Sequence, residues 1–204
     1  DLISGTTIFA VRFFTANASG WRVHVSTSFG SALTDDESSL LPVIASSPTK
    51  VFATVPGVTL QQGNITALGV NGTPTGTTAG TVFTATATIV DDYYNPVGNN
   101  GTGNVFFVTS DPYDVDGTTL TLSQGTTGFT VQMVQAGSQS ISMYHVQGIY
   151  STSTVSAIPI TAASINRVLV IMPGETYAPG RPPYAPASSG TGGKTGTPGT
   201  WTAG

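Results

Sequence analysis

One stretch constrains the fold more than any other: residues 80–97, which read GTVFTATATIVDDYYNPV. Its β-branched residues Val82, Thr84, Thr86 and Thr88 alternate with Phe83, Ala85, Ala87 and Ile89. A period of two with many β-branched residues predicts a half-buried β-strand. Asp91 and Asp92 end this pattern, and a turn signal, Asn95-Pro96, follows. We therefore expect residues 80–90 to form the central strand of a β-sandwich.

The composition favours extended structure and excludes several classes of function. Only 8% of the residues are charged, and Thr, Ser, Gly, Ala and Val dominate, which suits strands better than long helices. The net charge is −4, and the six Lys and Arg residues are scattered from Arg12 to Lys194, which argues against nucleic-acid binding. The chain has no cysteine, so disulfides, thiol catalysis and thiolate metal sites are excluded. We expect no membrane span and no signal peptide.

The chain also matches itself at an offset of about 120 residues, the kind of signal that a repeat leaves. Gly5-Thr6-Thr7 recurs as Gly125-Thr126-Thr127, and at the same offset Val11, Phe13, Ala16, Trp21 and Val23 meet Val131, Met133, Ala136, Ile141 and Met143. At an offset of 117, Pro42, Lys50-Val51, Pro56-Gly57 and Gly63 meet Pro159, Arg167-Val168, Pro173-Gly174 and Gly180. At an offset of 124, Thr78-Ala79-Gly80 meets Thr202-Ala203-Gly204. The matches are colinear and keep apolar residues in step.

These matches predict a module of roughly 120 residues, the usual length of one sandwich domain. We expect residues 1–49 to be the C-terminal strands of a partial copy and residues 50–165 to be one complete copy. Residues 166–204 would be a linker and the first strand of a following copy. Two interpretations stay open: the 204 residues are a window of a longer tandem array, or another chain completes the partial copies by strand addition.

The complete copy is predicted to contain seven strands, at residues 50–55, 80–90, 103–110, 118–122, 127–135, 138–146 and 152–160. Residues 61–79 are expected to be a long loop with at most a short edge strand. Seven antiparallel strands without helical periodicity predict an all-β, immunoglobulin-like β-sandwich. The side chains expected to close its core are Phe83, Ile89, Phe107, Leu120, Phe129, Val131 and Ile141.

Several of these segments resemble a known group of proteins. The order AGTVFTATATIVDDYYNPV, FVTSDP and GFTVQMVQAGSQSISM is similar to the tandem Ig-like (invasin- or filamin-like) repeats of large bacterial and archaeal surface proteins. VLVIMPGETYAPG and GKTGTPGTWTAG resemble the linkers between consecutive copies. The resemblance implies a non-catalytic role in stalks, fibres, adhesins or cell-wall coats, or as spacers in secreted enzymes. It implies no catalytic residues.

The Pro-rich and Gly-rich stretch at residues 173–200 admits two interpretations. It could be a solvated hinge between copies. It could instead lie on a neighbouring subunit, with Tyr177 and Tyr184 as anchors of the interface. The corresponding stretch, residues 57–79, has fewer prolines and tyrosines, so we expect the two stretches to differ in role.

Candidate chemistry is sparse. Asp91, Asp92, Asp111, Asp114 and Asp116 flank two predicted connections between strands, where they could cap turns or contribute to a calcium site. His24 and His145 occupy nearly equivalent places in two copies, and without a nucleophile nearby we expect them to be surface or strand-end residues. No catalytic residue, cofactor site or metal site is assigned.

Four Asn-X-Ser/Thr sequons, at Asn17, Asn64, Asn71 and Asn100, are possible glycosylation sites. All but the first fall in predicted loops. Attached glycans would suit an exposed surface fibre.

The sequence therefore favours a structural extracellular repeat protein, not an enzyme, that self-associates into a surface appendage, filament or cell-surface layer. One alternative is an adhesin or carbohydrate-binding module, for which Tyr93, Tyr94, Tyr113, Tyr177 and Tyr184 are candidate contact residues. The other is a spacer domain of a secreted polysaccharide-degrading enzyme.

Overall fold

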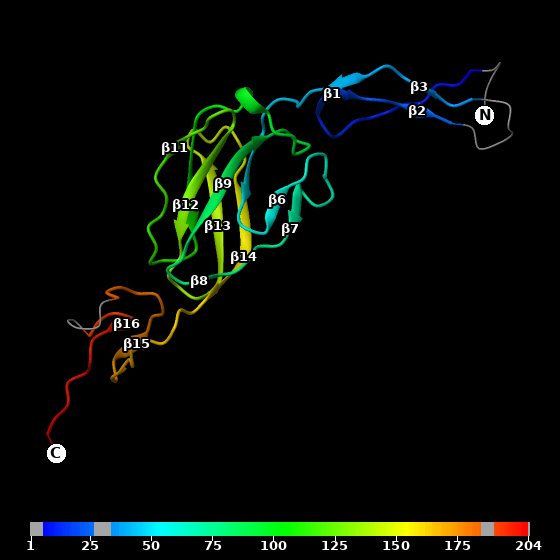
Figure 1. The fold of residues 1–204 in the computed structure, drawn as a ribbon. Coiled ribbons are helices and arrows are strands. Elements are labelled where there is room, and N and C mark those ends of the chain that lie inside the picture. Colours follow the sequence, from blue (N-terminus) through cyan, green and yellow to red (C-terminus); the bar gives the residue numbers. More distant parts are fainter. Residues whose placement is uncertain (1–5, 27–33, 185–189, 204) are drawn as a thin grey trace.

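The computed structural model describes residues 6–26, 34–184 and 190–203. Within these ranges the regular structure is β, apart from one 3₁₀ turn, η1 (Gly98–Asn100). The predicted all-β class is therefore confirmed. Figure 1 shows a central sandwich with an arm from the N-terminal part of the chain at one end and a hairpin from the C-terminal part at the other.

The sandwich consists of two sheets, and the chain crosses from one sheet to the other several times. One sheet has the order β12 (Thr126–Gln132), β9 (Val82–Val90), β5 (Lys50–Thr54). The other has the order β11 (Leu120–Thr121), β10 (Asn104–Thr109), β13 (Gly137–His145), β14 (Ser153–Thr161), β8 (Thr77–Thr78). Neighbouring strands are antiparallel except β14 and β8. All seven predicted strands are present, with ends shifted by a few residues.

Strand β9 is central to its sheet, as its alternating sequence predicts. It pairs with β5 on one side, where Lys50 faces Val90, and with β12 on the other, where Gln132 faces Val82. The alanines of β9 and Ile89 are completely buried, whereas its threonines lie on the outer face. Thr88 and Thr126 hydrogen bond across that face at 3.2 Å. The two faces of one strand thus separate core from surface.

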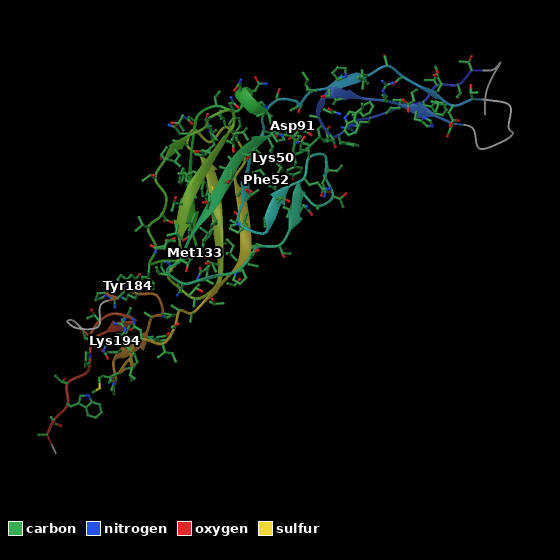
Figure 2. All side chains as sticks on the ribbon, in the orientation of Figure 1. Lys50, Phe52, Asp91, Met133, Tyr184 and Lys194 are labelled. Atoms are coloured by element: carbon green, nitrogen blue, oxygen red, sulfur yellow. The ribbon has the colours of Figure 1, made fainter. Side chains whose placement is uncertain are left out.

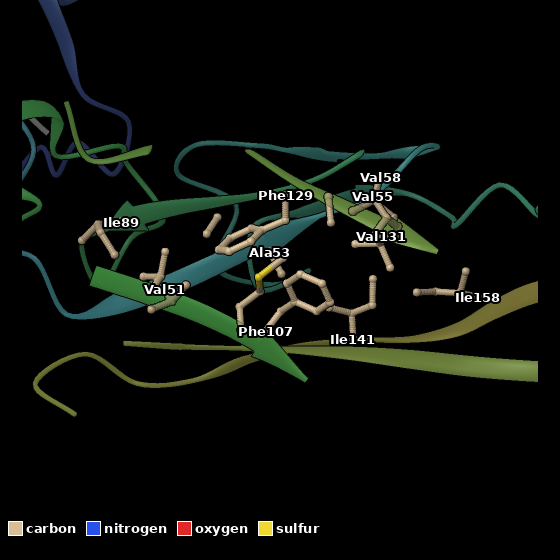
Figure 3. Close-up of a cluster of buried hydrophobic side chains, with 14 of the residues drawn as sticks. Val51, Ala53, Val55, Val58, Ile89, Phe107, Phe129, Val131, Ile141 and Ile158 are labelled. Carbon is tan, nitrogen blue, oxygen red and sulfur yellow. The ribbon is translucent and has the colours of Figure 1, made fainter. Parts of the chain in front are cut away.

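A single hydrophobic core fills the space between the two sheets (Figure 3). Of the predicted core residues, Ile89, Phe107, Phe129, Val131 and Ile141 are buried, and Phe83 and Leu120 are partly buried. The rings of Phe107 and Phe129 meet edge to face, with centroids 5.1 Å apart. Each fully buried side chain of this size stabilises the fold by roughly 1.5–3 kcal/mol.

The expected long loop at residues 61–79 is wrong in part, because the chain forms a hairpin there. Strand β6 (Val58–Leu60) pairs with β7 (Val70–Gly72), and β8 follows. Gly57 and Gly72 have φ angles of +85° and +92°, and a Cβ on Gly72 would clash with the carbonyl oxygen of Gly57. Only glycine permits so close an approach of the two backbones. A strand pair rich in glycine has no alternation of apolar and polar residues, so the sequence pattern does not predict it.

Residues 173–200, of which 185–189 lie outside the described ranges, also contain paired strands. Their described part contains strand β15 (Glu175–Tyr177), which pairs with β16 (Lys194–Gly196). The register repeats that of the first hairpin: Val58 faces Gly72 as Glu175 faces Gly196. Lys194 forms an ion pair with Glu175 at 2.8 Å and, as the largest effect, holds the pKa of that carboxyl below its ordinary value. The two stretches, which we predict to differ in role, thus share the register of one short strand pair.

The N-terminal arm is built from two short ladders. Strand β1 (Asn17–Trp21) pairs with β4 (Leu41–Val43), and β2 (His24–Val25) pairs with β3 (Asp36–Glu37). The pair Asn17–Val43 corresponds, at the offsets found in the sequence, to the pair Gly137–Ile160 of β13 and β14. The arm extends away from the sandwich (Figure 1).

No helix among the described residues is long and apolar enough to cross a membrane.

The core makes a first prediction. Replacement of Ile141, which is fully buried, by alanine is expected to lower the free energy of unfolding by about 2–5 kcal/mol, because the cavity it leaves cannot collapse completely. Val108→Ala is the control, since Val108 is 37% exposed on the outer face and its loss should cost less than about 1 kcal/mol. Urea denaturation measures both. Equal losses would contradict the assignment of the core.

Candidate functional site

The candidate site is the joint where the N-terminal arm meets the sandwich, and its centre is the turn from Asp91 to Asn95. Asp91 directly follows β9 and is only 1% exposed (Figure 2). Its Oδ1 accepts the backbone N–H groups of Tyr93 and Asn95, each at 2.9 Å. Its Oδ2 accepts the backbone N–H of Ser46, also at 2.9 Å, from the segment that leads into the sandwich. One carboxylate therefore joins the entry of the chain to the turn.

Asn95 connects this turn to the arm. Its side chain is 3% exposed, and its amide group donates to the carbonyl oxygen of Phe14 at 2.9 Å and to Asp91. Its Oδ1 accepts the backbone N–H of Ala16 at 2.8 Å. The side chain thus binds both a carbonyl and an N–H of one strand end, as a neighbouring β-strand would.

Aromatic and cationic side chains cover these polar contacts. The rings of Phe14 and Tyr93 meet edge to face, with centroids 5.3 Å apart. The guanidinium of Arg12 lies 4.9 Å from the Phe14 ring centroid and donates to the Tyr93 hydroxyl. Gly63 completes the joint: it donates to the Tyr93 carbonyl at 2.9 Å, and a Cβ on it would clash with Thr15. The joint therefore excludes water from the Asp91–Asn95 pair.

The environment of Asp91 has opposing effects on its pKa. Burial is the largest single effect and raises the pKa, because the charged form loses its hydration. The hydrogen bonds from Ser46, Asn95 and Tyr93 favour the charged form, and together they hold the pKa below its ordinary value. Asp91 is therefore ionised and stabilises the joint in neutral solution.

At the opposite end of the sandwich, the residues after β12 match the strand end that holds Phe14 and Ala16 in the joint. No turn like Asp91–Asn95 contacts them among the described residues. There the C-terminal hairpin lies close to β12, and a Cβ on Gly180 would contact Gln135, as one on Gly63 would contact Thr15. Beside this contact is an open cavity of about 460 Å³. Tyr177 and Tyr184, the predicted interface residues, both line it. Tyr184 donates to the Gly180 carbonyl at 2.9 Å, and its side chain is marked in Figure 2.

The five aspartates that could have shared a metal ion do not come together. Asp91 lies at the arm end of the sandwich, whereas Asp111 accepts the backbone N–H groups of Val134 and Gln135 near the other end, at 2.6 and 2.7 Å. No group of three or more His, Cys, Asp or Glu residues that could hold a metal occurs in the described ranges.

Each of the other aspartates has a local role. Asp114 and Asp116 accept hydrogen bonds from the side chain and the backbone of Thr109. Burial raises the pKa of Asp114, and the charges of Asp116 and Asp111 raise it further. Asp92 is exposed, and its carboxylate lies 3.8 Å from the ammonium of Lys50. These contacts support the interpretation of the aspartates as turn-forming residues.

The two histidines lie in different surroundings. His24 is half-exposed in the arm, 3.5 Å from the carboxylates of Asp35 and Glu37. His145 is buried at the end of β13, where Nε2 donates to the Thr102 carbonyl at 3.1 Å and the ring packs on Tyr150. Of the two predicted alternatives, a surface or a strand-end position, His24 is exposed and His145 is a buried strand-end residue. The segment that covers it, around Thr102, precedes β10.

The candidate tyrosines do not form one platform. Tyr93 packs in the joint, and Tyr94 lies between Phe52 and the Lys50 ammonium. The remaining three, Tyr113, Tyr177 and Tyr184, are at the opposite end, where they line adjoining cavities.

The sequons differ in their accessibility. Asn17 is half-buried in β1 and donates to the Gly20 carbonyl at 2.8 Å. Asn64 lies in a turn, bonded to Gln61. Asn71 is exposed in β7, so the prediction of a loop is wrong for it. Asn100 is exposed in η1.

Sequence reasoning missed the central residues of the joint. The sequence indicates only a turn at Asn95-Pro96, and no motif in it points to Arg12 or Phe14. Their contacts join residues about 80 positions apart, which no local pattern reveals. The one sequence signal that points to the joint is the internal repeat, because it matches Gly63, which lies in the joint, with Gly180.

No protein-family model matches the chain, and the curated proteins searched contain no match to it.

Asp91 makes a second prediction. Because its pKa is lower in the folded state, it stabilises the fold fully above its ordinary value of 3.8, and this stability is lost as the pH falls through the folded pKa. Asp91→Asn should therefore lower the free energy of unfolding by roughly 1–3 kcal/mol at pH 7. The difference from wild type should shrink as the pH falls below 3.8.

Denaturation at a series of pH values measures this difference. Asp92→Asn, one residue away and exposed, serves as the control and should change stability by less than about 0.5 kcal/mol. A difference for Asp91→Asn that stays constant into strong acid would show that the carboxylate is not the group responsible.

Proposed function

We propose that this chain is a structural repeat protein: tandem immunoglobulin-like modules that assemble, without catalysis, into an extracellular appendage, filament or cell-surface layer. The observation that carries the proposal is the recurrence of backbone geometry at the offsets of the sequence repeat. The hairpins β6–β7 and β15–β16 have the same register. In the ladders β1–β4 and β13–β14, the pairs Asn17–Val43 and Gly137–Ile160 occupy matching positions.

The hydrogen bonds around the two hairpins support the same conclusion. Val58 N–H donates to Val55 at 2.9 Å, and Glu175 N–H donates to Met172 at 2.9 Å. The bond from Gln61 to Gly69 and the bond from Ala178 to Gly193 are both 2.8 Å long. A hairpin that is copied with its register and its flanking turns is expected of a duplicated module, because stacked repeats conserve the contacts between neighbours.

The order of strands supports an immunoglobulin-like module. The first, second and fifth of the seven predicted strands form one sheet, and the third, fourth, sixth and seventh form the other. This distribution agrees with the sandwich in which the A, B and E strands face the C, F and G strands. The fourth strand, β11, then occupies the edge beside C.

The mechanism of such a protein is mechanical. Strand β5 starts at the arm end of the sandwich and β14 finishes at the hairpin end, so a pull on the chain loads the strands along their length (Figure 1). The β5–β9 ladder then resists in shear, where its hydrogen bonds must break together. The buried joint holds the arm against one end of the module.

The proposal predicts what the native material looks like. Electron microscopy of material isolated from its source should show elongated particles or ordered arrays with a regular module spacing. The intact mass should be well above the 20.8 kDa of these residues. Free compact particles of about that mass would contradict the proposal.

A second candidate function, glycan binding, is favoured by one observation. Tyr177 and Tyr184 are 64% and 51% exposed and line the same cavity, and exposed aromatic rings are typical of surfaces that stack on sugars. This function would suit an adhesin or an accessory module of a secreted enzyme.

A glycan array tests this second candidate. If the chain binds a glycan, Tyr184→Ala should weaken binding by about tenfold, the loss expected for one aromatic contact. Tyr144→Ala is the control, because Tyr144 stacks on Phe106 on the outer face of a sheet, with centroids 5.0 Å apart. Equal binding by both variants would rule out this cavity as the glycan site.

A further inference from the structure

The two ends of the sandwich are complementary in detail, and this carries an inference about what binds at the hairpin end. At the arm end, five positions hold the Asp91–Asn95 turn. Arg12 and Phe14 contact Tyr93, Ala16 and Ser46 donate to Asn95 and Asp91, and Gly63 donates to Tyr93.

The same five positions recur at the other end. At the offsets of 120 and 117, Arg12, Phe14, Ala16, Ser46 and Gly63 correspond to Gln132, Val134, Ala136, Ala163 and Gly180. All five of these residues line the one cavity of about 460 Å³. The set that surrounds a turn at one end therefore surrounds an open space at the other.

The backbone at this end is shaped before anything binds. The carboxylate of Asp111, which is 3% exposed, accepts the N–H groups of Val134 and Gln135 and so fixes the strand end that leads to Ala136. The hairpin is also in place, since a Cβ on Gly180 would meet Gln135 and one on Gly63 would meet Thr15, the residue at the matching position. Half of a joint exists here, and the Asp–Asn turn is the missing half.

We infer that this cavity receives an Asp91–Asn95-type turn from a following module of the same kind, an inference that rests on the proposed repeat function. The asparagine of that turn donates to the Val134 carbonyl and accepts from the Ala136 N–H. The aspartate accepts from the Ala163 N–H. The tyrosine that corresponds to Tyr93 packs on Val134, beside Tyr177 and Tyr184.

The side chains around the cavity differ from those of the first joint in a way that affects its strength. Gln132 and Val134 replace Arg12 and Phe14, so the cation and the ring that cover Tyr93 are absent. Tyr177 and Tyr184 occur where the first hairpin has Leu60 and Ala67. The aromatic cover of the second joint therefore comes from the hairpin and not from the strand end.

The experiment uses the full 204-residue chain and a lengthened chain, in which a second copy of residues 81–165 follows Gly204. Thr202-Ala203-Gly204 matches Thr78-Ala79-Gly80, so this addition continues the repeat in register. Amide hydrogen exchange is measured by NMR. In the lengthened chain the Ala136 and Ala163 amides should exchange at least about tenfold more slowly than in the 204-residue chain.

A matched pair of variants identifies the contact. Asn95→Ala in the appended copy should return the Ala136 amide to its rate in the 204-residue chain, while the appended strands stay protected. The same change at Asn95 itself should speed exchange at Ala16, whose N–H it holds at 2.8 Å, and leave Ala136 unaffected.

The possible failures are distinguishable. If the appended residues are protected but Ala136 and Ala163 exchange as fast as before, the inferred docking is wrong and the repeat proposal survives. If the appended residues show no protection at all, the continuation does not fold as a module, and the repeat proposal fails together with this inference.

Discussion

The buried carboxylate of Asp91 is the interaction on which the arrangement of arm and sandwich depends. An ionised group that is 1% exposed is strongly destabilising unless its oxygens are satisfied. Here they accept N–H groups from Ser46, which lies before β5, and from Tyr93 and Asn95, which lie after β9. Asp91 thereby fixes both the segment that enters β5 and the turn that carries Asn95. The side chain of Asn95 then fixes the end of the arm at Phe14 and Ala16.

Asp111 has a comparable role at the other end, where its carboxylate shapes the strand end at Val134 and Gln135. One end of the sandwich thus presents a turn, and the other presents a strand end with a cavity beside it. If the inferred docking at this cavity holds, two different but complementary ends give a head-to-tail contact, which continues from module to module instead of closing into a dimer. This geometry suits the proposed fibre or surface layer better than a closed assembly.

The same sequence positions can be buried or exposed, depending on their neighbours. Phe129 and Val131 are 3% and 1% exposed in β12, whereas Phe9 and Val11 at the matching positions of the arm are 70% and 54% exposed. Likewise, Val51 is buried in β5, and Val168 is 92% exposed. The difference lies in the partner strands: β9 joins β12 and β5 in the sandwich, and no counterpart of β9 pairs with the arm or with residues 167–172 in the described chain. Burial is therefore a property of the completed sandwich.

The sequence by itself determined the all-β class, seven of the eight strands in the two sandwich sheets and part of the core, because alternation along β9, β10 and β13 is a local signal. It also determined the offsets that match Gly63 with Gly180. Only the tertiary structure decided that β6 pairs with β7 and β15 with β16, since the glycines of these segments permit close backbone contacts that have no periodic pattern. It alone decided that Asn95 binds Phe14 and Ala16, because such a contact depends on how distant segments pack and not on the residues around it.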